Sequence, residues 1–559
     1  MSNSYLEVAA SKRESNLAKI PKEWLLKSIP PPEEVPNVSK FLPNILSDQE
    51  MAIITSTATE LVATIADGKL TALEVTKAFC HSAAVNHQLT RCLSELFFDK
   101  AIERATELDA YFNKNGHTVG PLHGLPISLK DQVNLKGVST SIGFIAPFMA
   151  QEYADAICGY DDSNRDKDSL IAQSLAKAGA VFYVKTTVPM AMLGYDTRTT
   201  LFGKTLNSIN RKLSPGGSSG GEASLIGGLG SVVGLGTDIG GSIRGPSAFQ
   251  GLYGLRASTD RFSYLNVSNS YPHQPILKSV IGPIAKNLED LKLVSKTIIN
   301  SNEWEEDPKV IPIPWRETEL GNDLSFGIME WDGVVYPHPP ITRALKMVEK
   351  ALQLVGYDTI DFVPPIKHQG SGGPLDLLIG IFTSDSLLEL EKYCAMSGEP
   401  MNDLLSGFGV KNKTLLNVAE TWEQSKEKYK IQLAYDEGVR ETRHSTKSGK
   451  PIDCFITPGW GSTSYISGEN FRSPSTYTRY LNVLDYSVIT IPVTHVDKEI
   501  DLPHTYSPTN ELDRANYENY DPELTHGMPV TLQLVCGRYQ EEKCVALAEK
   551  VVEALKSVQ

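Results

Sequence analysis

Two glycine-rich stretches place serine hydroxyls on tight turns. The first is Gly216-Gly-Ser-Ser-Gly-Gly221, and the second is Gly236-Thr-Asp-Ile-Gly-Gly-Ser-Ile-Arg244. Backbone N–H groups on such a turn converge on one point, which is the geometry that binds a developing oxyanion. Ser242 stands directly after two glycines and fits the position of a nucleophile. The glycines alone leave structural turns and phosphate-binding loops open as alternatives.

A serine hydroxyl is a weak nucleophile until a neighbouring group takes its proton. Lys130 is a candidate for that role, at the end of the apolar run Gly124-Leu-Pro-Ile-Ser-Leu-Lys130. A lysine accepts a proton only when neutral, and burial lowers its pKa from about 10.4 toward 7 or 8. Taken by itself, Lys130 is more readily explained as a strand-end lysine whose ammonium group reaches solvent.

Spacing excludes the phosphate and metal motifs that the chain partly matches. Gly203-Lys204-Thr205 resembles the end of a phosphate loop, but Arg198 stands where the first glycine must be. The run Asp162-x-Asn164-x-Asp166 begins like a calcium loop, but Lys167 and Gln173 replace its glycine and its bidentate glutamate. The 11 histidines show no metal-ligand spacing. We expect no metal and no cofactor.

Gly216-Gly-Ser-Ser-Gly220 also satisfies G-x-S-x-G, the nucleophile elbow of α/β-hydrolases. That elbow requires a strand ending at the motif, whereas residues 207–215 are polar and turn-like. A catalytic triad would also need a histidine. Three lie downstream, at His495, His504 and His526, but none has a convincing triad context. A His-dependent serine esterase with Ser218 as nucleophile stays open as an alternative, which the G-x-S-x-G match favours and the residues before it disfavour.

Together, Lys130 with its preceding run, the Gly216–Gly221 stretch and the Gly236–Pro246 stretch resemble the amidase signature family. Ser218 and Ser242 are 24 residues apart, which is the spacing of that family. The long N-terminal helical segment and Asn482-Val-Leu-Asp485 are most similar to its fungal acetamidase or general amidase branch.

This resemblance implies an α/β fold with a large twisted mixed sheet sandwiched between helical layers. It also implies hydrolysis of a carboxamide through an acyl-enzyme, with Ser242 as nucleophile, Ser218 as a bridging serine beside a cis peptide bond, and Lys130 as base. The implied oxyanion hole consists of the N–H groups of Ile239, Gly240, Gly241 and Ser242. The residues implied to orient these loops are Ser219, Asp238 and Arg244.

The substrate pocket is the least constrained part of the site. Four apolar residues near family contact regions are candidate pocket walls, with packing in the core as the alternative: Phe144, Met190, Met192 and Trp460. Gly245 stands where a larger side chain is common in the family, and the missing bulk is expected to reshape the acyl pocket.

Hydrophobic periodicity predicts the elements that position these residues. An N-terminal helical lead is expected over residues 1–60, and a capping box at Ser47–Glu50 begins a helix within it. A second capping box, at Thr71–Glu74, begins a helix after it. Further helices are expected over 99–116, 168–179 and 222–235, and strands over 125–129, 180–185 and 487–493. Residues 124–260 form the expected catalytic core, and 300–450 a more polar, variable helical region.

Composition bounds the remaining possibilities. The length of 559 residues suggests three or four domains as a first estimate, which the resemblance replaces with a single domain. A net charge of -14 disfavours nucleic acid and anionic membrane surfaces as partners. The absence of a signal-like N terminus, of long apolar runs and of paired cysteines predicts a cytoplasmic protein.

We expect a small-molecule amide as the ligand and allow for a homodimer. A glutaminase-type subunit of a tRNA-dependent amidotransferase stays open as an alternative, because it resembles the same catalytic core. A non-catalytic binding protein on the same scaffold is the other alternative.

Overall fold

A computed structural model describes residues 4–159, 167–272, 274–402, 415–468 and 475–558. Within them, 11 strands form one sheet in the order β1-β3-β2-β6-β8-β7-β12-β13-β11-β9-β10. The centre of this sheet, from β6 to β11, is antiparallel, and both flanks contain parallel pairs. The expected α/β fold with a large mixed sheet and surrounding helices is therefore confirmed. The strands are β1 (Leu93–Leu96), β2 (Pro126–Lys130), β3 (Val181–Thr186), β6 (Val233–Asp238), β7 (Tyr253–Arg256), β8 (Val280–Ala285), β9 (Ser325–Ile328), β10 (Asp358–Asp361), β11 (Cys454–Pro458), β12 (Ser487–His495) and β13 (Pro529–Cys536).

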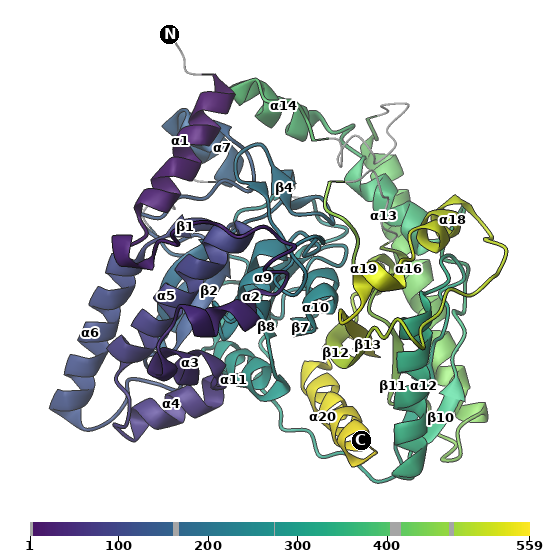
Figure 1. Ribbon diagram of the computed structural model, residues 1–559. Coiled ribbons are helices and arrows are strands. Elements are labelled where there is room, and N and C mark those ends of the chain that lie inside the picture. Colours follow the sequence, from purple (N-terminus) through teal and green to yellow (C-terminus); the bar gives the residue numbers. More distant parts are fainter. Residues whose placement is uncertain (1–3, 160–166, 273, 403–414, 469–474, 559) are drawn as a thin grey trace.

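The N-terminal half of the chain forms one side of the molecule, and α12, α16 and α20 lie on the other side (Figure 1). Both predicted capping boxes are present, at the starts of α3 and α5. The helices of the first half are α1 (Tyr5–Ala18), α2 (Val38–Phe41), α3 (Asp48–Thr55), α4 (Ala58–Ala66), α5 (Ala72–Thr90), α6 (Phe98–Asn115), α7 (Gln151–Cys158), α8 (Leu170–Lys177), α9 (Gly220–Gly227), α10 (Arg244–Gln250) and α11 (Leu288–Ile299).

The second half supplies the outer strands β9 to β11 and the helices that pack on them. Helices α12 and α20 contact β12 and β13, while α13 and α16 contact α17. The helices of this half are α12 (Pro339–Leu354), α13 (Pro374–Phe382), α14 (Leu388–Ser397), α16 (Val418–Glu441), α17 (Thr476–Leu484), α18 (Glu511–Glu518), α19 (Pro522–Thr525) and α20 (Glu541–Ser557).

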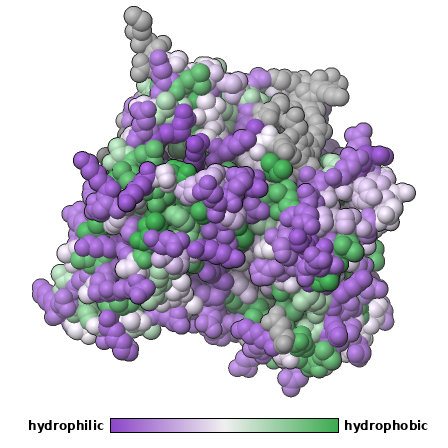
Figure 2. Space-filling model, in the orientation of Figure 1, coloured by the Kyte–Doolittle hydropathy of each residue, from purple (hydrophilic) through white to green (hydrophobic). Residues whose placement is uncertain are grey.

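The core consists of two principal clusters of buried apolar side chains. One contains Ile127 of β2, Val233 of β6 and Leu547 of α20, and the other contains Val488 of β12 and Tyr480 of α17. On the exterior, Figure 2 shows hydrophilic side chains over much of one face, between smaller hydrophobic areas.

The predicted helix over residues 222–235 is correct only as far as residue 227. Helix α9 ends at Gly227, Leu229 adopts a left-handed φ of 64°, and residues from Val233 onward form strand β6. The strand needs glycine for a packing reason, because a Cβ at Gly234 would lie 1.7 Å from Glu222 Oε1. Small residues that suggested close helix packing instead let a strand approach α9.

The 300–450 region is helical as expected in α12, α13, α14 and α16, but it also contributes β9 and β10. These are four-residue strands that pair in parallel at one edge of the sheet. Strands this short leave too little period-two pattern to be recognised in a polar sequence.

Candidate active site

Lys130 is the last residue of β2, which runs parallel to β6. Because parallel strands end at the same edge of a sheet, Lys130 and Thr237 of β6 lie side by side. The Lys130 side chain is fully buried. Its Nζ lies 2.8 Å from Ser218 Oγ and 2.7 Å from Thr237 Oγ1. The fold thus joins two of the three predicted catalytic residues by a direct hydrogen bond.

Ser218 stands on the turn that leads into α9. It follows a cis peptide bond between Gly217 and Ser218, as the resemblance implied. A Cβ at Gly217 would lie 2.5 Å from Gly194 O, so only glycine fits there. The next residue, Ser219, donates its N–H to Ser242 O at 3.1 Å. Ser219 therefore ties the two serine-bearing turns together.

Ser242 lies on the turn between β6 and α10. Gly241 before it has a φ of 125°, and a Cβ there would lie 2.3 Å from Thr478 Oγ1. Both the backbone conformation and the space around this turn therefore require glycine. Ser218 and Ser242 line one small cavity.

Asp238 braces the Ser242 turn from within. Its carboxylate accepts from Gly241 N at 2.8 Å, Ile243 N at 3.1 Å, Arg244 Nε at 3.0 Å and Asn482 Nδ2 at 2.8 Å. A second bond from the Arg244 guanidinium, at 2.9 Å, makes the ion pair bidentate. Burial works against the ionised carboxylate, but Arg244 and Asn482 outweigh it and hold the Asp238 pKa well below its usual range. The predicted orienting role of Asp238 and Arg244 has this geometric basis.

The brace also affects the predicted oxyanion hole. The N–H of Gly241 is already bonded to Asp238. For the N–H groups of Ile239, Gly240 and Ser242, no bonding partner occurs among the residues that the structure describes. Three of the four predicted donors are thus open to a ligand.

Burial lowers the pKa of Lys130 to about 7, against the opposing attraction of Asp238, Glu222 and Asp131. Burial likewise raises the pKa of the Glu222 carboxyl to about 7, despite hydrogen bonds from Ser128 and Thr186. At pH values above 7 a large fraction of Lys130 is therefore neutral and can accept a proton.

Comparison with known proteins identifies the family. The profile of the family described as Amidase matches residues 74–545. The chain is 40% identical to an acetamidase of Emericella nidulans over 571 aligned positions, which cover 100% of both chains. It is 39% identical to an acetamidase of Aspergillus oryzae, with 99% of each chain covered. This chain belongs to the amidase family. It is a hydrolase that acts on amides.

Solved structures of other amide hydrolases have a similar fold. A fatty acid amide hydrolase superposes on this amidase with a TM-score of 0.90 and 32% identity, over 98% of this chain and 95% of that chain. A 6-aminohexanoate cyclic dimer hydrolase, at 18% identity and a TM-score of 0.68, shares the fold.

In this amidase the cavity at the two serines is narrow, with a volume of about 10 Å³, roughly the space of one water molecule. Among the five predicted pocket residues, only Met192 belongs to its lining within the described residues. The cavity is lined by Gln132, Ala191, Met192, Leu193, Ser218, Thr237, Ile239, Ser242, Asn269, Ser270, Tyr271 and Ser279.

The other predicted pocket residues lie outside this lining. Phe144 and Met190 belong to the neighbouring apolar cluster, where Phe144 packs against Tyr393 with ring centroids 5.6 Å apart. Gly245 faces Trp460, and a Cβ at Gly245 would lie 2.8 Å from that ring. The missing side chain at Gly245 thus accommodates Trp460 behind the catalytic turn.

The histidines of the esterase alternative lie away from the serines. None of His495, His504 and His526 lines the cavity that Ser218 and Ser242 share. Gly203 and Lys204 form β5, a two-residue strand paired with β4 (Arg198–Thr199). The acidic run 162–166 lies outside the described residues.

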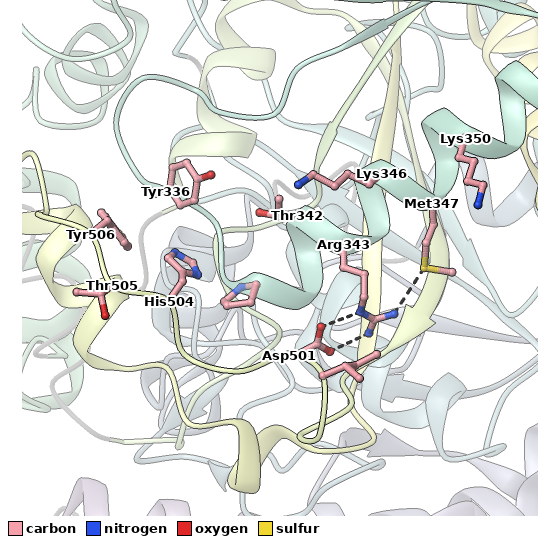
Figure 3. A pocket seen from close by; sticks show the side chains of 12 residues that line it. Tyr336, Thr342, Arg343, Lys346, Met347, Lys350, Asp501, His504, Thr505 and Tyr506 are labelled. Atoms are coloured by element: carbon pink, nitrogen blue, oxygen red, sulfur yellow. Dashed lines mark hydrogen bonds and ion pairs between the residues drawn. The ribbon is translucent and has the colours of Figure 1, made fainter.

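A larger cavity of about 810 Å³ opens elsewhere on this amidase, between α12 and the 500–506 segment (Figure 3). Its Arg343 is held by Asp501 through bonds of 2.7 and 2.8 Å. No group of three or more His, Cys, Asp or Glu in the described part of the chain is arranged to hold a metal ion. None of the described helices is long and apolar enough to cross a membrane.

Sequence reasoning gave no role to several residues of the site, among them Gln132, Thr237, Tyr271 and Asn482. Gln132 and Thr237 stand next to recognised motif positions, two residues after Lys130 and one before Asp238. That adjacency was an available signal. Tyr271 and Asn482 reach the site from distant segments. No local pattern marks Tyr271, whereas Asn482 lies in the Asn482–Asp485 stretch that carried the family resemblance without indicating a role in the site.

Proposed function

We propose that this amidase hydrolyses small carboxamides to a carboxylic acid and ammonia or an amine through an acyl-enzyme on Ser242. The observation that supports this proposal most directly is the 2.8 Å hydrogen bond between the buried Lys130 amine and Ser218 Oγ, in a cavity that Ser242 shares. A neutral lysine, a hydroxyl and a second hydroxyl in this order can move a proton away from an attacking oxygen.

In the proposed reaction, Ser242 Oγ attacks the amide carbonyl carbon. Its proton passes to Ser218, whose own proton passes to Lys130. The free N–H groups of Ile239, Gly240 and Ser242 bind the resulting oxyanion. When the intermediate collapses, the carbon–nitrogen bond breaks and the proton returns from Lys130 through Ser218 to the leaving nitrogen. Water then attacks the ester, its proton follows the same route, and Ser242 and the carboxylic acid are released.

The substrate is proposed to carry a short acyl group. Because the cavity has about the space of one water molecule, any acyl group must displace lining side chains such as Met192 and Tyr271, and a short acyl group displaces them least. The acetamidase names of the two fungal relatives point in the same direction. Phe144, Met190, Gly245 and Trp460 remain proposals as more distant walls for larger acyl groups.

A hydrolysis screen over aliphatic, aryl and amino-acid amides tests this proposal. We expect short aliphatic amides such as acetamide to give the highest kcat/KM, and aryl amides with bulky acyl groups the lowest. Selective hydrolysis of glutamine would instead support the amidotransferase subunit. Absence of turnover across the whole panel would support a binding protein.

Three broader expectations remain proposals. A single catalytic domain over the whole chain is supported by a sheet whose strands extend from residue 93 to residue 536. A cytoplasmic location is supported by seven cysteines that are all free and buried. A homodimer stays a proposal that size-exclusion chromatography would test.

A further inference from the structure

Behind Lys130 lies a chain of buried polar groups that the proposed reaction does not use. Lys130 Nζ donates to Thr237 Oγ1 at 2.7 Å, and Thr237 Oγ1 donates to Gln132 Oε1 at 2.6 Å. Gln132 Nε2 in turn donates to Ser268 O at 2.7 Å and to the hydroxyl of Tyr264 at 2.6 Å. Lys130, Gln132 and Ser268 are almost completely buried, and Gln132 and Thr237 also line the small cavity at the two serines.

The direction of every bond in this chain is fixed by one backbone carbonyl. Ser268 O can only accept, so the Gln132 side-chain atom that faces it must be the NH₂ group. The atom that faces Thr237 is consequently the Gln132 carbonyl oxygen, which also can only accept. Thr237 has a single hydroxyl proton, and Gln132 binds it. Thr237 can therefore meet Lys130 only as an acceptor.

This direction decides where the lone pair of a neutral Lys130 points. A neutral amine has two N–H groups and one lone pair in tetrahedral directions. One N–H is taken by Thr237 Oγ1, and Thr237 O lies 3.5 Å away for the second. The remaining direction, occupied by the lone pair, faces Ser218 Oγ at 2.8 Å. Lys130 is thus held as an acceptor toward Ser218.

We propose that Gln132 is a positioning residue that, through Thr237, fixes the lone pair of Lys130 on Ser218. The inference rests on the proposed function, in which Lys130 is the base. Without the Gln132 carbonyl, the Thr237 hydroxyl is free to turn and donate its proton to the Lys130 nitrogen. Thr237 would then occupy the lone pair that Ser218 needs.

Gln132→Met tests this role, because methionine fills similar space and cannot accept the Thr237 proton. We expect the plateau of kcat/KM to fall at least about tenfold. A Thr237 hydroxyl that donates to Lys130 stabilises the neutral amine, whereas in the native protein it accepts and favours the ammonium. The acidic limb of the pH profile should therefore move to lower pH, by roughly half a unit or more.

Gln132→Glu is the matched second variant, because either protonation state of the carboxyl still accepts from Thr237. We expect it to keep a higher plateau than Gln132→Met, with a limb that does not move to lower pH. Gln88→Met is the control for losing a hydrogen-bonded amide elsewhere in the fold, since the half-buried Gln88 also accepts one bond and donates two, to Trp24 O and Ala84 O. Gln88→Met should lower the melting temperature and leave both kcat/KM and the limb unchanged.

The inference is overturned if Gln132→Met loses no more activity than Gln88→Met, or if its limb stays in place or moves to higher pH. That result, in an enzyme that still requires Lys130 and still acylates Ser242, would refute only the positioning role. Loss of the Lys130 requirement itself would instead refute the proposed function.

Discussion

At the scale of single residues, the protonation of Lys130 should set the pH dependence of this amidase. Burial lowers the Lys130 pKa to about 7, so the amine gains its proton as the pH falls below that value. We expect kcat/KM to rise with pH along an acidic limb near pH 7 and then to level off. Steady-state kinetics on a short aliphatic amide between pH 5 and 9 would measure this limb.

Substitution of Lys130 should remove the base. We expect Lys130→Ala to reduce kcat/KM by roughly 10²- to 10⁴-fold, the usual contribution of a general base. Lys130→Arg should not rescue activity, because a guanidinium stays protonated over the accessible range. If Lys130→Ala keeps most of the activity and a change at His495, His504 or His526 erases it, the lysine mechanism is wrong.

Ser242→Ala should abolish amide hydrolysis while the protein stays folded, because it removes only the attacking oxygen from a turn that glycine supports. Intact-mass measurement after treatment with a fluorophosphonate should find one adduct on the native protein, at Ser242, and none on the variant. Circular dichroism of the variant checks its fold. An adduct on Ser218 in the native protein would favour the nucleophile-elbow alternative.

The resemblance of three motifs to the amidase signature family predicted that Lys130 and Ser218 come together, and the structure joins them by a hydrogen bond. The bonds of Gln132 to Thr237 and of Asn482 to Asp238 could not be predicted, since hydrogen bonds between segments over 100 residues apart leave no periodic trace in the sequence. The contact between Gly245 and Trp460 could not be predicted for the same reason, because only the fold places that ring against the glycine.

At the scale of elements, α10 and α17 together hold the turn that carries Ser242. Arg244 at the start of α10 binds Asp238 through two nitrogens and donates to Asn482 Oδ1 of α17 at 2.7 Å. A lysine carries charge but lacks the planar fork that makes these bonds at once. The geometry of the catalytic turn therefore depends on arginine at this position.

We expect Arg244→Lys to lower kcat/KM at least about tenfold and to lower the melting temperature, because it leaves buried acceptors unpaired. Arg343→Lys is a matched control, since Arg343 makes a similar two-bond contact with Asp501 in the cavity of Figure 3. That control should keep its activity. Equal kinetic losses in both variants would contradict a specific role for the Arg244 brace.

The elements themselves were predicted best where hydrophobic periodicity was long or capped, as in α3, α5, α6 and β12. The helix expected over 222–235 was predicted to extend too far, because glycine and small residues serve both close helix packing and close strand packing. Only tertiary contacts, here Glu222 against Gly234, decide between the two.

At the scale of the whole molecule, a single sheet joins the two halves of the chain. Strands from both halves pair at the centre, where β7 of the first half meets β12 of the second. The Ser242 turn and the α17 residues that brace it are therefore contributed by two halves of a continuous sheet. Pairing between strands more than 200 residues apart is invisible to composition.

Catalysis should not depend on a metal ion, because the proposed proton relay needs no Lewis acid. Prolonged dialysis against EDTA should leave kcat/KM unchanged, measured against a sample dialysed without chelator. Recovery of activity by zinc after a loss in EDTA would contradict the mechanism.

The stability of the whole protein should also record the cost of keeping Lys130 neutral. The Lys130 pKa is about 7 in the folded protein and 10.5 without burial. Between these values the unfolded chain binds a proton that the folded chain does not, so this lysine costs stability at pH 7 and less as the pH rises toward 10.5. Each pKa unit corresponds to about 1.4 kcal/mol, so the cost in folding stability at pH 7 amounts to several kcal/mol.

Lys130→Met removes this cost. We expect the variant to be inactive but to melt at a higher temperature than the native protein at pH 8, with the difference shrinking at pH 9 and 10. Differential scanning fluorimetry of both proteins across this range measures the trend. Lost hydrogen bonds to Ser218 and Thr237 shift the difference by a constant, so its slope with pH is the diagnostic quantity. A difference that stays flat or grows with pH would mean that Lys130 is charged in the folded protein.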